Sequence, residues 1–352
     1  MRAITVVPGK AKSVRLDETS VVRPAPGELL VEAVALGICG TDLDIISGKY
    51  GAAPPGEERL ILGHESLGRV LEAPRGSGFA TGDLVVGIVR RPDPVPCPAC
   101  AAGEWDMCRN GLYTERGIKA QHGYGCERYA LEPNFAVKVE PGLGPLGVLL
   151  EPTSVVAKAW DHIERIGARA RSWKPRTLLV TGAGPVGLLA AMIGREKGLE
   201  THVLDQVDSG PKPRLVADLA ATYHRDPRVI ADLAADIVLE CTGADSLVLR
   251  VIQYGGRDSI VCLAGLSSGG RTVNFDVGGF DRQAVLQNDV VFGSVNANRS
   301  HYEAAGAALA QADHAWLERL ISRRVPLEHW REAFVRKPDD VKVVVDFSPE
   351  AP

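Results

Sequence analysis

The stretch over residues 177–194, TLLVTGAGPVGLLAAMIG, constrains the fold of this chain more than any other. It carries no charge and is nearly long enough to cross a bilayer as one helix. Four glycines and a proline interrupt it, however, and divide it into a short buried strand, a tight turn and a helix. This order of elements favours a doubly wound α/β fold over a membrane span.

The pattern of predicted strands and helices changes along the sequence. After residue 177, strand patterns such as THVLD and DIVLEC alternate with helix patterns such as PRLVADLAA, which predicts a parallel sheet with right-handed crossovers. Before residue 150, short β-like runs between Gly and Pro clusters predict an irregular antiparallel or barrel-like domain. Near the end, helices are expected over SHYEAAGAALAQA and HAWLERLIS, and the terminal strand VKVVVDF is expected to rejoin the first domain. The expected boundaries are 1–155, 156–290 and a returning segment, 291–352.

The composition is that of an ordinary globular protein with a small-molecule partner. The chain of 352 residues has a formal net charge of -4 and an isoelectric point near 6.1. Neither value favours nucleic acid or an anionic membrane as a partner. Seven cysteines, an odd number, without a secretion signal at the N-terminus indicate a reducing compartment, where clustered thiols are ligands. The cytoplasm is the expected location.

A GxGxxG pattern lies between the predicted strand and helix. It consists of Gly182, Gly184 and Gly187, with Pro185 and Val186 inside it. The first glycine permits the tight turn, the second lets the backbone approach a pyrophosphate, and the third allows close packing of helix on strand. The helix N-terminus then offers free N–H groups to phosphates. The pattern predicts a dinucleotide-binding Rossmann domain; the alternative is a glycine-rich turn that binds nothing.

Asp205 ends the next predicted strand and bears on the choice of dinucleotide. Its carboxylate can accept hydrogen bonds from the adenosine ribose of NAD and would repel the 2'-phosphate of NADP. Gln206 and Val207 bring no positive charge, although Lys212 and Arg214 follow. A solvated strand end that caps the next turn is the alternative interpretation. We predict that NAD is preferred and that NADP is the poorer cofactor.

Two short stretches, GICGTD over 37–42 and LGHES over 62–66, contain side chains that bind metals. Cys39 offers a soft thiolate and His64 an imidazole, the mixed donor set that zinc prefers. The adjacent Glu65 can ligate a metal or hold a water. Taken singly, such a Cys is usually a small buried hydrophobe, and a His beside a Gly is more often a turn residue.

Several motifs occur in the order seen in a known family. MRAITV, GICGTD, LGHES, the cysteine-rich PCPACAAGEWDMC and TGAGPVG resemble zinc-dependent medium-chain alcohol and polyol dehydrogenases. Further stretches, covering nearly the whole chain, resemble the glucose 1-dehydrogenase branch known from archaea: VRRP (89–92), YTERGI (113–118), QHGY (121–124), LLEP (149–152) and GSVNANRSHYEAA (293–305). The resemblance implies a GroES-like β-barrel catalytic domain joined to a Rossmann domain. It also implies an NAD(P)-dependent aldose 1-dehydrogenase of carbohydrate metabolism, with glucose as the leading substrate, that forms a homodimer or homotetramer.

The resemblance further implies a catalytic zinc. Cys39 and His64 would hold it, with Glu65 and Glu151 nearby as ligands or water-holders. For Glu151, a helix N-terminal charge is an equally open interpretation. Asp42 would orient His64 through its other ring nitrogen, and Thr41 would be the hydroxyl of the proton relay.

Substrate and cofactor contacts are implied in the same way. Glu115 and Asn296 match sugar-contacting positions of the family, and Glu151 would lie at the same end of the site. Thr242 and Gly243 match positions where the backbone passes close to the cofactor. Without the resemblance, Glu115 and Asn296 would be ordinary surface polar residues.

The cysteine-rich stretch resembles a lobe that binds a second, structural zinc in this superfamily. Cys97, Cys100 and Cys108 match the last three of its four cysteines, and Pro94, which cannot ligate, stands at the first position. The neighbouring Asp93 could supply the fourth ligand of a closed tetrahedral site. A lobe that has lost its metal is the alternative. In neither case is this the catalytic site, because a closed ligand set leaves no position for substrate.

Two other functions stay open at this stage. A polyol, cyclitol or aminosugar dehydrogenase would use the same zinc and relay on a secondary alcohol. A catalytically inactive structural protein would keep the nucleotide-binding fold without turnover. Joint retention of Cys39, Thr41, His64 and Glu65 argues against the inactive protein.

Overall fold

The computed structural model describes residues 1–267, 269–270 and 272–347. They form two compact units. One unit comprises Met1–Ser154 together with the residues from Asn296 onward, and the other comprises Val155–Val295. In the described part of the chain, no helix is both long enough and apolar enough to cross a membrane.

The second unit is built on a parallel sheet with the order β14-β13-β12-β15-β16-β17. In chain order within the unit this is 3-2-1-4-5-6, the order of a dinucleotide-binding Rossmann sheet. The central strands are almost continuously buried, because helices cover the faces of a parallel sheet. The strands are β12 (Thr177–Thr181), β13 (Glu200–Leu204), β14 (Thr222–His224), β15 (Ile237–Glu240), β16 (Ile260–Leu263) and β17 (Val290–Gly293).

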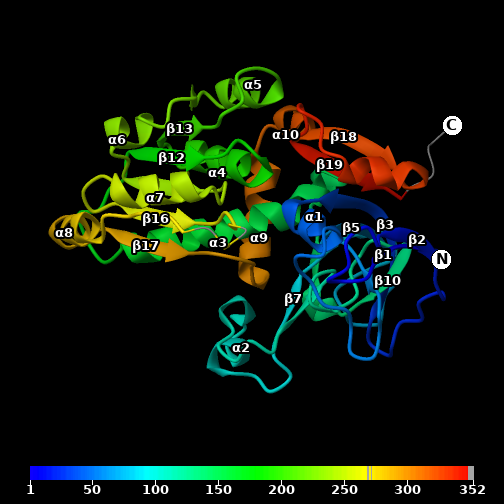
Figure 1. The fold of residues 1–352 in the computed structure, drawn as a ribbon. Coiled ribbons are helices and arrows are strands. Elements are labelled where there is room, and N and C mark those ends of the chain that lie inside the picture. The colour runs from blue at the N-terminus through cyan, green and yellow to red at the C-terminus, as the bar shows by residue number, and fades with distance from the viewer. Residues whose placement is uncertain (268, 271, 348–352) are drawn as a thin grey trace. The chain divides into compact units, whose positions relative to one another are not determined.

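Helices connect and flank these strands (Figure 1). Residues 177–194 form β12 and most of α4, so the doubly wound α/β fold predicted from this stretch is confirmed. α3 begins in the first unit and continues into this one. The helices are α3 (Leu150–Gly167), α4 (Pro185–Glu196), α5 (Pro211–Asp218), α6 (Val229–Leu233), α7 (Asp245–Gln253) and α8 (Val277–Gln287).

The first unit is an irregular, mostly antiparallel β structure, as predicted. Its main sheet has the order β11-β6-β5-β3-β19-β18, with β10 also paired to β3, and two smaller sheets have the orders β2-β1-β4 and β7-β8-β9. The strands are β1 (Arg2–Val6), β2 (Arg15–Glu18), β3 (Leu29–Ile38), β4 (Leu60–Ile61), β5 (Glu65–Glu72), β6 (Leu84–Gly87), β7 (Arg90–Arg91), β8 (Thr114–Arg116), β9 (Ala120–Gln121), β10 (Arg128–Leu131), β11 (Ala136–Lys138), β18 (Ile321–Pro326) and β19 (Lys342–Asp346).

Short helices complete this unit. They are α1 (Gly40–Ile46), α2 (Pro98–Ala101), α9 (Arg299–Gln311), α10 (His314–Leu320) and the 3-10 helices η1 (Trp105–Met107), η2 (Pro133–Phe135), η3 (Pro141–Leu149) and η4 (Leu327–Phe334). Where a helix over HAWLERLIS was expected, α10 ends at Leu320. The next residues form β18, because Ile321–Pro326 pair with β19.

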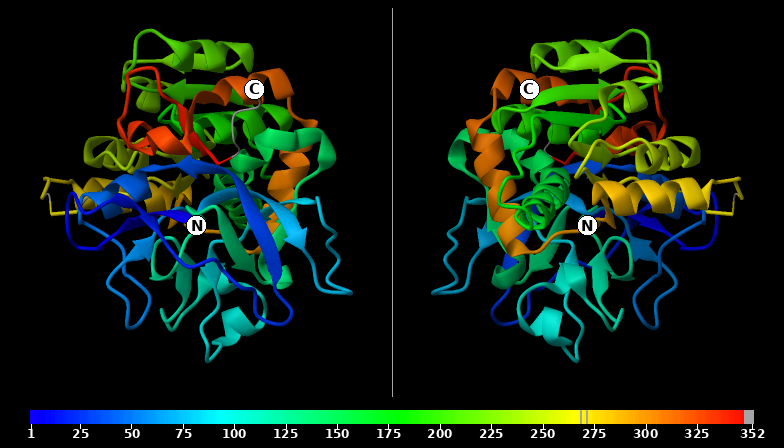
Figure 2. Two further views of the ribbon diagram at one scale, coloured as in Figure 1. Left: turned by 90° about the vertical axis from the view of Figure 1, so that its right-hand side faces the viewer. Right: turned by 90° about the vertical axis from the view of Figure 1, so that its left-hand side faces the viewer.

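The end of the chain is part of the first unit. β19 pairs antiparallel with β3, with Val343 opposite Ile38 and Val345 opposite Leu36. In Figures 1 and 2 the C-terminal strands (red) therefore lie against the N-terminal sheet (blue). All four side chains belong to one apolar core. This pairing also places the start of β19 and the start of β5 on the two sides of the end of β3.

Candidate functional site

Cys39 and His64 meet at the end of β3 and the start of β5. The two strands are neighbours in the main sheet, with Gly37 opposite Glu65. The Cys39 Sγ lies 3.0 Å from the His64 Nε2, and one donor atom from each of Cys39, His64 and Glu65 lies within 4.8 Å of the other two. The site therefore offers a thiolate, an imidazole and a carboxylate over a span that fits a zinc ion.

Asp42 contacts both residues of this pair. Cys39 caps α1, where its Sγ accepts a hydrogen bond from the Thr41 amide and its own amide donates to an oxygen of Asp42. The other Asp42 oxygen lies 3.4 Å from the His64 Nδ1, which leaves Nε2 facing the thiol. Burial lowers the pKa of His64, but the negative charges of Cys39 and Asp42 outweigh it and raise that pKa well above its usual value. The surroundings thus favour a positive charge, which fits a cation held by Cys39 and His64.

Glu65 forms an ion pair with Lys342, which the sequence did not suggest. Both of its carboxylate oxygens accept hydrogen bonds from the Lys342 Nζ of β19, at 2.7 and 2.5 Å, and both side chains are almost fully buried. Gly37 leaves room for this carboxylate, because a Cβ there would lie 2.0 Å from the Glu65 Oε2. The glycine that opens GICGTD is therefore required by the Glu65–Lys342 pair.

Glu151 lies in the first turn of α3 and is buried. Burial raises its pKa to about 7, and the charges of His64 and Lys342 oppose that rise. The charges of the site therefore influence Glu151. Its carboxylate is nevertheless outside the group of donor atoms from Cys39, His64 and Glu65 that lie within 4.8 Å of one another.

Glu115 and Asn296 lie together in the first unit. The Asn296 Nδ2 donates to the Glu115 Oε1 at 2.7 Å. Asn296 has a left-handed backbone with φ 65, which is uncommon for a residue with a side chain. Glu115 is buried and also pairs with Arg90 at 2.9 Å. These two residues are thus parts of one polar cluster, not separate surface groups.

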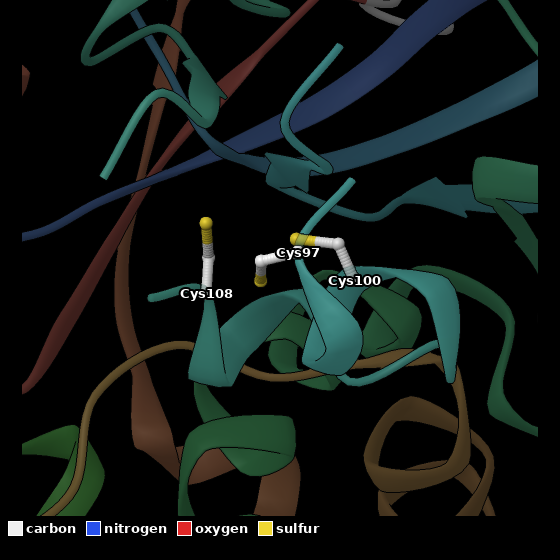
Figure 3. Close-up of side chains that lie close together, drawn as sticks. All are labelled: Cys97, Cys100 and Cys108. Atoms are coloured by element: carbon white, nitrogen blue, oxygen red, sulfur yellow. The ribbon is translucent and has the colours of Figure 1, made fainter. Parts of the chain in front are cut away.

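The three cysteines of the cysteine lobe, defined here as residues 93–109, also come together. Figure 3 shows the side chains of Cys97, Cys100 and Cys108 lying close together beside α2, and their sulfur atoms lie within 4.8 Å of one another. Hydrogen bonds from the amides of Arg109 and Cys100 lower the pKa of Cys97 to about 6, so its thiolate is favoured at neutral pH. This arrangement fits a structural zinc.

Asp93 is buried beside this group without joining it. Its Oδ1 accepts a hydrogen bond from the Val95 amide, whereas its Oδ2 has no hydrogen-bond partner among the described residues. Its carboxylate is outside the group formed by the three sulfur atoms. Asp93 as fourth ligand therefore stays a prediction.

The glycine turn of the second unit has the shape that a pyrophosphate requires. Gly182 has φ 90, and a Cβ on Gly187 would lie 1.8 Å from the Gly182 carbonyl oxygen, so both positions need glycine. A Cβ on Gly184 would meet no atom within 4 Å, so this side of the turn is open. α4 begins at Pro185, followed by Val186, with no side chain capping its amides. These amides can bind an anion at the helix N-terminus.

The other cofactor candidates lie at the same edge of the sheet. The Asp205 carboxylate accepts hydrogen bonds from the amides of Ala183, at 2.7 Å, and Val207, at 3.1 Å, and lies 3.4 Å from the Lys212 Nζ. Thr242 and Gly243 follow β15, and the buried Glu240 accepts from both of their amides. β12 and β15 are neighbours where the strand order reverses, the place where such sheets bind dinucleotides.

Comparison with known proteins agrees with this geometry. Residues 25–141 match the model of the alcohol dehydrogenase GroES-like domain, and residues 144–347 match that of the glucose dehydrogenase C-terminus. The chain is 39% identical to glucose 1-dehydrogenase of Methanocella arvoryzae, covering 98% of this chain and 99% of that protein. It is 40% identical to glucose 1-dehydrogenase of Thermoproteus tenax, covering 98% and 99%.

The solved structures point the same way. Haloferax mediterranei glucose dehydrogenase in complex with NADP, Zn and gluconolactone superposes with a TM-score of 0.92 at 30% identity, covering 99% of this chain and 100% of that one. The fold, with its GroES-like and Rossmann parts, is therefore that of this group. The chain belongs to the glucose dehydrogenase family of zinc-dependent medium-chain dehydrogenases.

Proposed function

We propose that this protein oxidises an aldose, D-glucose first of all, at C1 to the lactone, with zinc and a nicotinamide dinucleotide. The observation that carries this proposal is the Cys39–His64 pair, with His64 buried and Cys39 partly buried and with Asp42 behind His64, in a chain whose second unit has a complete GxGxxG turn. Family membership narrows the substrate from alcohols in general to a sugar.

We propose that Cys39 and His64 hold the catalytic zinc, with Glu65 and Glu151 as ligands or water-holders. When bound, zinc lowers the pKa of the sugar hydroxyl, and the nicotinamide accepts the hydride. Asp42 keeps the His64 Nε2 directed at the metal. The Thr41 amide donates to the Cys39 Sγ, and we propose that the Thr41 hydroxyl passes the substrate proton outward.

We further propose that Glu115 and Asn296 bind sugar hydroxyls. Three donors from Arg90 and Asn296 reach the Glu115 Oε1, and in the described residues none reaches Oε2. An ionised carboxylate accepts several hydrogen bonds, so Oε2 is available to a hydroxyl. A buried acceptor of this kind disfavours an alcohol that cannot donate to it.

The cysteine lobe is proposed to hold a structural zinc on Cys97, Cys100 and Cys108, with Asp93 as fourth ligand. The seven cysteines are all free thiols. A site built on thiolates suits the reducing cytoplasm, which we propose as the location.

Pairing of two copies is proposed through the edge of the nucleotide-binding sheet. β17 is an edge strand, and exposed apolar side chains lie on it and on α8: Val277, Val285, Leu286 and Val291. An unpaired strand edge beside apolar surface is a natural interface for a second copy, giving a homodimer or homotetramer.

The choice of cofactor is predicted to depend on Asp205. Its two backbone donors leave lone pairs for the ribose of NAD, and its charge would repel the extra phosphate of NADP. We expect Asp205→Ala with Gln206→Arg to raise the NADP to NAD ratio of kcat/KM roughly ten- to a hundred-fold, since a hydrogen bond to a charged group is worth about 1.5–3 kcal/mol. Asp208→Arg, which makes the same change of two charges at an exposed position of the same loop, is the control. An unchanged ratio in the double variant would remove Asp205 from cofactor selection.

The proposed function is tested by the initial rate of reduced-nicotinamide formation from D-glucose with NAD and with NADP. We expect turnover that favours NAD, disappears after treatment with a chelator and returns on adding zinc. A panel of polyols and cyclitols, run alongside, should react more slowly. Turnover on a polyol but not on glucose, or full activity after zinc removal, would contradict the proposal.

A further inference from the structure

Arg90 joins the proposed sugar-binding carboxylate to the cysteine lobe. It lies on β7 with 5% of its surface exposed. Its Nε and Nη2 donate to the Glu115 Oε1 at 3.1 and 2.9 Å, and its Nη1 donates to the backbone carbonyl of Asp106 at 3.0 Å. One side of the guanidinium therefore holds Glu115 and the other holds the lobe.

The turn over residues 296–298 makes the same connection a second time. The Asn296 Nδ2 donates to the Glu115 Oε1 at 2.7 Å, and the Asn298 Nδ2 donates to the Asp106 Oδ1 at 3.0 Å. Glu115 and Asp106 are thus bridged both by Arg90 and by two asparagines of one turn. Apart from the partly buried Asn296, the network is buried, so each member keeps its geometry only while its partners are in place.

Asp106 belongs to the part of the lobe that carries the thiols. It lies in η1, between Cys100 and Cys108. The amide of Cys108 donates to the Trp105 carbonyl, and the amide of Arg109 donates to the Cys97 Sγ at 3.4 Å. Closure of the three thiols around a metal therefore fixes the position of Asp106 as well.

We infer that the cysteine lobe, acting through Asp106 and Arg90, is the positioning element that directs Glu115 toward the substrate. The inference rests on the proposed function, in which Glu115 binds a sugar hydroxyl. Arg90 and the asparagine turn place their donors on Oε1 and so set the rotation of the carboxylate, which leaves Oε2 for the sugar. The lobe then contributes to substrate affinity and not only to stability.

Two adjacent buried arginines supply the experiment and its control. Arg90→Lys keeps the charge but loses the planar fork that reaches Glu115 and Asp106 together. Arg91→Lys changes the other residue of β7, which pairs with Glu132 at 2.9 Å outside this network. We expect Arg90→Lys to raise the KM for D-glucose roughly ten- to a hundred-fold, with kcat and the KM for NAD within about two-fold. Arg91→Lys should change none of these. Equal effects of the two variants, or an equal fall in kcat and in cofactor affinity, would overturn the inference.

A milder variant keeps the test valid if Arg90→Lys folds poorly. Asn298→Ser retains the N-cap of α9, because serine caps helices well, but is too short to reach Asp106. It should raise the KM for glucose in the same direction by roughly three- to ten-fold. Cys108→Ser should do the same while lowering the zinc content of the lobe, measured by metal analysis. A normal KM in both variants would mean that the lobe is structural only.

Deoxy sugars separate this inference from the proposed function. Each variant is assayed on the monodeoxy derivatives of D-glucose. The penalty of Arg90→Lys should vanish for the derivative that lacks the hydroxyl held by Glu115, whereas a structural defect would act on all sugars alike. If Glu115→Gln itself leaves the KM for glucose unchanged, the proposed role of Glu115 fails. If Glu115→Gln raises that KM and Arg90→Lys does not, only the present inference fails.

Discussion

Cys39→Ser is expected to remove the catalytic zinc and to lower glucose turnover by about a thousand-fold or more. Metal-ion catalysis is worth several kcal/mol of transition-state stabilisation, and about 4 kcal/mol corresponds to a thousand-fold in rate. The Cys39 thiol is the soft donor of the group and lies 3.0 Å from the His64 Nε2, so a hydroxyl there leaves a much weaker site. Zinc per chain and the initial rate of glucose oxidation are measured on the same preparation.

The matched control is Cys126→Ser, in the same unit. Cys126 is buried, outside both cysteine-containing groups, and its thiol donates to the Arg128 carbonyl, a hydrogen bond that serine can reproduce. This variant should retain its zinc and its turnover. Normal zinc content with full activity in Cys39→Ser would exclude Cys39 as a ligand. If the unsubstituted chain shows no turnover and Cys39→Ser only loses zinc, the result would support a structural protein.

The nucleotide-binding unit was predictable because its signals are local. The turn at Gly182–Gly187 is specified by residues next to one another in sequence, and strand and helix patterns alternate on either side of it. The edge strand β14 and the exposed helix α8 escaped prediction. β14 is short, and α8 buries no side chain, so neither shows a strong apolar period.

The catalytic unit was harder, because its geometry depends on contacts between distant parts of the chain. Spacing alone does not place Cys39 beside His64; the pairing of β3 with β5 does, and only the family resemblance anticipated it. Lys342 and Arg90 were missed for the same reason. A lysine inside the apolar run VKVVVDF was a usable signal, since a lone charge in a buried strand needs a partner, but nothing local indicated that the partner is Glu65.

Lys342→Met is expected to destabilise the first unit by about 3–5 kcal/mol, because it leaves the buried carboxylate of Glu65 without its counter-charge. Glu65 and Lys342 are both almost fully buried, and both oxygens are bonded to one ammonium group. Burial lowers the pKa of Lys342, but the charge of Glu65 outweighs it and the net shift is upward, so the pair favours the charged lysine. Unfolding in urea, followed in the presence of a chelator so that zinc does not contribute, measures the change.

The double variant Lys342→Met with Glu65→Gln shows whether an unpaired Glu65 charge causes the loss of stability in Lys342→Met. If the penalty is that of an unpaired buried charge, neutralising Glu65 should recover most of it, and the two single changes should be strongly non-additive. Lys337→Met, an exposed lysine shortly before β19, should alter stability by no more than about 0.5 kcal/mol. Additive penalties in the double variant would instead mean that Lys342 stabilises the unit independently of Glu65, as through its contact with the Ile38 carbonyl. In that case the negative charge of Glu65, beside the proposed metal site, would not contribute to the pairing of β19 with β3.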